Sequence, residues 1–103
     1  MSLSPEVKAK LTARFNARLP ETLESLRRAR AALRDDEEAA WSRVLHLSHQ
    51  VAGTAGSFGW CNLTERARVV QRYASAEEGI GALDALVREI EAAIERCRVG
   101  ASQ

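Results

Sequence analysis

The sequence predicts an all-α protein, an antiparallel up-down bundle of four helices that forms a single domain over residues 1–103. Only two prolines occur, at positions 5 and 20, and no segment shows the strict alternation of apolar and polar residues that is typical of a β-strand. Apolar residues instead recur every three or four positions along four segments, which is the spacing of one helix face. Because only a few residues separate these segments, successive helices are expected to be antiparallel.

The first segment opens with a helix start signal. Ser4 can cap the free N–H groups, and Pro5 suits the first helical position. Pro20 is expected to kink or split this helix, because proline lacks an N–H and clashes with the preceding turn. The apolar residues along one face are Val7, Leu11, Phe15, Leu19, Leu23, Leu26 and Leu33.

The second segment begins with four acidic residues at positions 35–38. They could form a binding patch, but we favour a capping role, since carboxylates suit the positive end of the helix dipole. The expected buried stripe of this second helix consists of Ala40, Trp41, Val44, Leu47, Ser48, Val51 and Ala55.

Capping residues and apolar periodicity predict the last two helices. Asn62 can cap the third helix, and Ser75 with Glu78 resembles a capping box for the fourth. The expected buried residues are Leu63, Ala67, Val70 and Ala74 in the third helix, and Ile80, Leu83, Val87, Ile90, Ile94 and Cys97 in the fourth.

Charge and composition exclude several classes of function. Fifteen basic and fourteen acidic residues give a net charge of +1, which provides no general attraction to nucleic acid or to a membrane surface. The arginines at positions 27–34 follow glutamates at helix-pair spacing, so a solvated face is expected. Cys61 and Cys97 form no CxxC pair. The sequence contains neither a signal peptide nor a membrane span, so a cytoplasmic protein is expected.

A histidine on the second helix is the main candidate for chemistry. His49 points about 140° away from the centre of the buried stripe, so it is expected to face solvent. Ala52, Gly53 and Gly56 follow it on the same face and leave space around the imidazole. Two interpretations remain open: a nucleophile that another protein can approach closely, or an ordinary surface histidine followed by glycines that end the helix.

Residues 49–59, HQVAGTAGSFG, resemble the signature of histidine-containing phosphotransfer domains. That signature has a histidine, an apolar residue two positions on, a glycine four positions on, small residues, and then an aromatic residue and a glycine. The matching positions are His49, Val51, Gly53, Thr54, Ala55, Gly56, Phe58 and Gly59. The resemblance implies a four-helix bundle that accepts a phosphoryl group on His49 and exchanges it with an aspartate of a response-regulator receiver domain.

The resemblance also implies roles for residues near the histidine. Members of the family commonly have a lysine three positions after the histidine, where this chain has Ala52. Arg68 on the third helix could supply the missing cation, and Arg72 is a weaker candidate. Gln71 stands where the family often has a residue that holds the imidazole, so its amide oxygen would accept Nδ1–H and leave Nε2 free to attack. Gly59, with the small residues before it, would keep the site accessible.

The implied partners are a receiver domain and a hybrid or sensor histidine kinase. Mg²⁺ is expected on the receiver and not on this chain, which needs no cofactor. Because no nucleotide-binding motif is present, the chain is expected to be a phosphocarrier and not an enzyme. A monomer is expected, although no residue pattern decides the oligomeric state.

Three rival functions compete with phosphotransfer. The strongest is a docking module that binds a receiver or kinase through the same face without carrying phosphoryl. A zinc site at His46 and His49 lacks further ligands, although Cys61 is nearby in the sequence. Serine chemistry at Thr54 or Ser57 lacks an orienting acid and an oxyanion hole.

Overall fold

A computed structural model describes residues 4–101, and these form four α-helices and one short 3-10 helix. The elements are α1 (Pro5–Ala32), α2 (Glu37–Thr54), η1 (Ala55–Phe58), α3 (Cys61–Val70) and α4 (Ala76–Ala101). Residues 4–101 contain no strand, so the predicted all-α class is confirmed.

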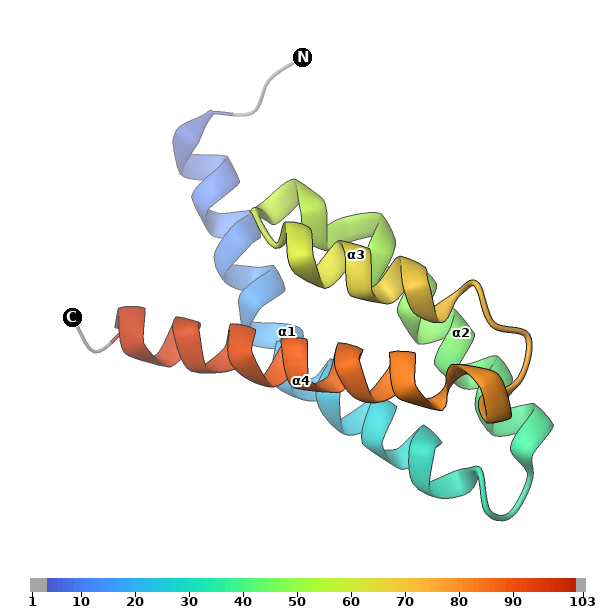
Figure 1. Ribbon diagram of the computed structural model, residues 1–103. Helices are drawn as coiled ribbons and strands as arrows, with labels where there is room; N and C mark the ends of the chain where they lie inside the picture. Colours follow the sequence, from blue (N-terminus) through green and yellow to red (C-terminus); the bar gives the residue numbers. More distant parts are fainter. Residues whose placement is uncertain (1–3, 102–103) are drawn as a thin grey trace.

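The four helices form a ring in which each packs against two others (Figure 1). α1 and α3 both lie between α2 and α4, and neighbouring helices run in opposite directions. The connections α1–α2 and α3–α4 therefore meet at the same end of the bundle, on the right in Figure 1. η1 lies towards the other end and leads from α2 into α3.

α1 begins as expected but passes Pro20 without a break. Ser4 Oγ accepts a hydrogen bond from the Val7 N–H at 3.2 Å, and Pro5 occupies the first helical position. The helix is continuous through Pro20, so the predicted split is wrong. In Figure 1 the blue and cyan parts of α1 nevertheless run in different directions. That Pro20 causes this change of direction stays a prediction.

The core follows the predicted stripe closely in α2 and less closely in the last two helices. All seven expected positions of α2 are buried. In α4, however, Leu86 and Ala93 are fully buried while Val87 and Ile94 are only partly buried. The buried face of α4 is therefore wider than the single seam that the periodicity predicted. Ala74 is exposed because α3 has already ended at Val70.

The Trp41 side chain packs between the beginnings of α2 and α4, and we call this contact the Trp41 clamp. The Trp41 side chain is 2% exposed, and its Nε1–H donates to the Tyr73 carbonyl oxygen at 3.0 Å. Gly79 of α4 lies directly against this ring, since a Cβ built there would stand 2.6 Å from Trp41 Cη2 and 2.9 Å from Tyr73 Cβ. The close approach of α4 to the indole therefore requires glycine.

Two contacts hold η1 and the start of α3 against α1. The rings of Phe15 and Phe58 stack with their centroids 5.0 Å apart. The Trp60 Nε1–H donates to Asn16 Oδ1 at 2.8 Å. Trp60, and not Asn62, is the residue that precedes the first turn of α3, so the predicted Asn62 cap is wrong. These aromatic contacts fix the chain just beyond the glycine-rich end of α2.

Two arginines near the C-terminal end of α1 form ion pairs with α4. Arg30 binds Asp84 through two parallel hydrogen bonds of 2.7 and 3.2 Å, and Arg27 binds Glu91 at 2.6 Å. These pairs account for two of the basic side chains in the sequence cluster. The sequence predicted a solvated face paired with the preceding glutamates, and Arg28 does lie 3.4 Å from Glu24, but the ion pairs with α4 were not predicted.

Candidate functional site

His49 lies exposed on α2, and the buried face of that helix fixes where it points. Asp36 Oδ1 accepts from the Ala39 N–H at 3.1 Å and caps the helix start. Ser48 and Val51, which flank His49 in the sequence, are buried in the core. The buried stripe of α2 faces the core, and His49 lies on the opposite side of the helix from the centre of that stripe. The predicted exposure of His49 is confirmed.

The three glycines after His49 occupy three different environments. Gly53 lies one turn beyond His49, and a Cβ built there would have no neighbour within 4 Å. Gly56 falls in η1 and not in α2, and its Cβ would stand 3.2 Å from Thr64 Oγ1 of α3. Gly59 has φ +87°, a left-handed backbone that turns the chain towards α3. Of the three, only Gly53 opens the surface of α2 beside the histidine.

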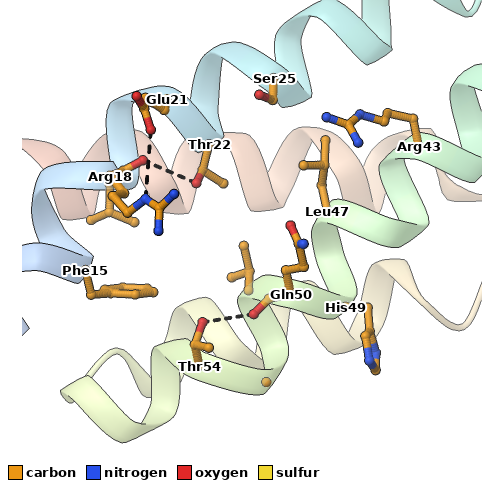
Figure 2. A pocket seen from close by; sticks show the side chains of 13 residues that line it. Phe15, Arg18, Glu21, Thr22, Ser25, Arg43, Leu47, His49, Gln50 and Thr54 are labelled. Carbon is orange, nitrogen blue, oxygen red and sulfur yellow. Dashed lines mark hydrogen bonds and ion pairs between the residues drawn. The ribbon is translucent and has the colours of Figure 1, made fainter. Parts of the chain in front are cut away.

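A groove of about 610 Å³ runs between α1 and α2, and His49 lies on its rim (Figure 2). In Figure 2 the His49 imidazole points away from the other labelled side chains and out of the groove. Leu19, Leu47 and Val51 give the groove an apolar floor, while Arg18 and Arg43 stand on its opposite walls. Arg18 is within 4.0 Å of Glu21 on the same wall.

The residues expected to assist His49 lie on the neighbouring helix. Arg68 is in the last turn of α3, Gln71 follows directly after that helix, and both side chains are exposed. Within residues 4–101 the His49 side chain makes no hydrogen bond or ion pair, so it is not hydrogen-bonded to Gln71. Arg72 lies 3.9 Å from Glu65. The orienting role of Gln71 and the phosphoryl contact of Arg68 therefore stay predictions.

Ala52, three residues after His49, is partly buried and packs against the core. Its methyl group leaves no charged atom beside the imidazole on α2. His46 is exposed one turn before His49. In the described part of the chain no three histidine, cysteine or acidic side chains form a group that could hold a metal ion.

Comparison with known proteins identifies the family. The family model for the Hpt domain matches residues 10–100, which is nearly the whole chain. The chain belongs to the Hpt domain family. Members of this family are phosphocarriers of two-component phosphorelays, are not kinases, and interact with response-regulator receiver domains. No curated protein and no solved structure matches the chain significantly.

The family match confirms the resemblance to phosphotransfer domains that residues 49–59 suggested. No helix within residues 4–101 is long and apolar enough to cross a membrane. The groove beside α2 was not found from the sequence, since it depends on how α1 lies across that helix. Phe15 was a partial sign of this groove in the sequence. It continues the apolar stripe of α1 beyond the fully buried residues, and in the structure it lines the groove.

Proposed function

We propose that this Hpt domain accepts a phosphoryl group on His49 and exchanges it with an aspartate of a receiver domain. The observation that supports this most directly is the exposed imidazole on a capped, well-packed helix, with open space at Gly53 one turn away. A receiver active site can approach such a nucleophile closely without displacing any side chain of α2.

The chemistry requires one nucleophilic nitrogen on this chain. The lone pair of His49 Nε2 attacks the phosphorus of the receiver's phospho-aspartate in line with the bond that breaks. The N–P bond forms as the P–O bond to the aspartate breaks, and the carboxylate leaves with the electron pair. The receiver supplies Mg²⁺, which offsets the charge of the phosphoryl oxygens. The reverse transfer uses the same geometry.

Gln71 and Arg68 are the proposed assisting residues. The Gln71 amide oxygen accepts Nδ1–H when the receiver closes over the site, which fixes the tautomer with Nε2 free. Arg68 is exposed and has no ion pair within residues 4–101, so its guanidinium is available to the phosphoryl oxygens. The proposed partners are a receiver domain and a hybrid or sensor histidine kinase, with the chain acting as a cytoplasmic monomer.

The test is transfer of radiolabelled phosphoryl from a panel of phosphorylated receiver domains to this chain. The wild-type chain should gain a label that acid removes, as expected for a phosphorylated histidine, and His49→Gln should gain none. His46→Gln is the matched control, since His46 is equally exposed on the same helix one turn earlier. Label on His49→Gln, or loss of label from His46→Gln alone, would refute the assignment.

A docking module that carries no phosphoryl is the second candidate function. The observation in its favour is Ala52, which stands three residues after His49 where family members commonly have a lysine. This candidate predicts that a receiver binds the face of α2 with equal affinity for wild type and His49→Gln, and that neither chain becomes labelled.

A further inference from the structure

A second pocket, of about 290 Å³, lies at the end of the bundle where α2 and α4 begin. Its floor is apolar: Trp41 is buried and Leu45 is partly buried. Its rim carries the carboxylates of Glu37 and Glu38, which are exposed and form no ion pair within residues 4–101. The lining residues are Glu37, Glu38, Trp41, Ser42, Leu45, Ala74, Ser75 and Ala76.

The pocket and His49 lie along one stripe of α2. Glu38, Ser42, Leu45 and His49 follow one another at intervals of four, three and four residues, which is the spacing of a single helix face. At a rise of about 1.5 Å per residue, Leu45 is about 6 Å and Glu38 about 16 Å from His49 along the helix axis. A protein surface that reaches the imidazole and lies along α2 therefore also covers the pocket.

The chemistry of the pocket matches a long basic side chain. Covering Glu37 and Glu38 without a cation would remove water from two carboxylates and leave them uncompensated. An aliphatic stem of three or four carbons fits the apolar floor of Trp41 and Leu45 and brings its charged head to the rim. A purely apolar side chain would satisfy only the floor, and an acidic one would be repelled.

We propose that this pocket receives a lysine or arginine side chain of the same receiver domain that exchanges phosphoryl with His49, and thereby selects that receiver. The proposal rests on the proposed function of His49, but it concerns docking and not the transfer step. The receiver residue would lie about 6 to 16 Å from the phosphorylated aspartate, measured along α2.

The test uses the full chain and the receiver that labels it fastest. Glu37→Gln and Glu38→Gln are combined in one variant, and the matched control combines Glu77→Gln and Glu78→Gln. The control pair also lies in the first turn of its helix, one position further from the helix start, at the same end of the bundle, and lines no part of the pocket. Both variants lose two negative charges near a helix N-terminus, so a weakening seen in the pocket variant alone reports on the pocket.

The pocket variant should raise the KM for the receiver by about three- to tenfold, with an unchanged transfer rate at saturating receiver. The control variant should stay within about twofold of wild type. Equal weakening by both variants would show a general charge effect and overturn the proposal, as would unchanged KM in the pocket variant. A wild-type chain that no receiver labels would instead refute the function of His49, and this proposal with it.

Discussion

Replacing Gly79 with alanine tests whether the Trp41 clamp holds α4 in place. The added Cβ would stand 2.6 Å from Trp41 Cη2, where an ordinary contact is 3.4–4 Å. The indole cannot withdraw easily, because its ring is 2% exposed and its N–H is bonded to the Tyr73 carbonyl. Either the ring moves and stretches that hydrogen bond, or the first turn of α4 moves away from α2.

The expected cost follows from three contributions. Overpacking of a core typically costs about 1–3 kcal/mol. A weakened indole hydrogen bond costs about 1 kcal/mol more. The greater helix propensity of alanine returns about 1 kcal/mol. Gly79→Ala should therefore lower the free energy of unfolding by about 2 kcal/mol, and the Tm by roughly 10 °C for a domain of this size.

Gly81→Ala is the matched control for this measurement. Gly81 lies in the same helix two residues later, and a Cβ there would have no neighbour within 4 Å. Its variant should be more stable than wild type by up to about 1 kcal/mol. Urea unfolding followed by circular dichroism measures both variants. Equal stabilisation by the two substitutions would refute the reasoning, because it would show that the indole yields freely to a methyl group.

Three further predictions concern single side chains. Ser48→Ala should raise the unfolding free energy by about 1 kcal/mol in the same assay, because the Ser48 hydroxyl is fully buried and has no hydrogen-bond partner. The hydrogen bond from Arg30 lowers the pKa of Asp84, so the pair stabilises the fold above about pH 4 and loses that contribution as the pH falls through the lowered pKa. Because both side chains are more than a third exposed, Asp84→Asn should cost under about 1 kcal/mol at pH 7, and this cost should shrink as the pH falls through the lowered pKa. If Arg68 contacts the phosphoryl group, Arg68→Ala should slow labelling of the chain by about tenfold and Ala52→Lys should restore it, whereas equal rates for all three chains would refute that contact.

The sequence predicted those parts of the fold that depend on one helix at a time. The period of α2 placed its six buried residues and Ala55 of η1 correctly and turned His49 outwards. The same reasoning missed Leu86 and Ala93 in α4, because the prediction followed one narrow seam and the buried face of α4 includes residues beside that seam. The grooves beside α2 depend on how distant segments cross, and periodicity carries no information on crossing.

The glycines show why position matters more than residue type. The glycines after His49 left two interpretations open, a helix end or a surface kept bare, and the structure divides them: α2 ends at Thr54, Gly59 adopts a left-handed turn, and Gly56 lies close to Thr64. No contact or backbone conformation within the described chain requires glycine at position 53, although glycine inside a helix costs about 1 kcal/mol relative to alanine. Gly81 is equally unconstrained, so open space around a glycine is not by itself a sign of function. What distinguishes Gly53 is its place one turn after an exposed imidazole, which leaves open surface beside the proposed phosphorylation site.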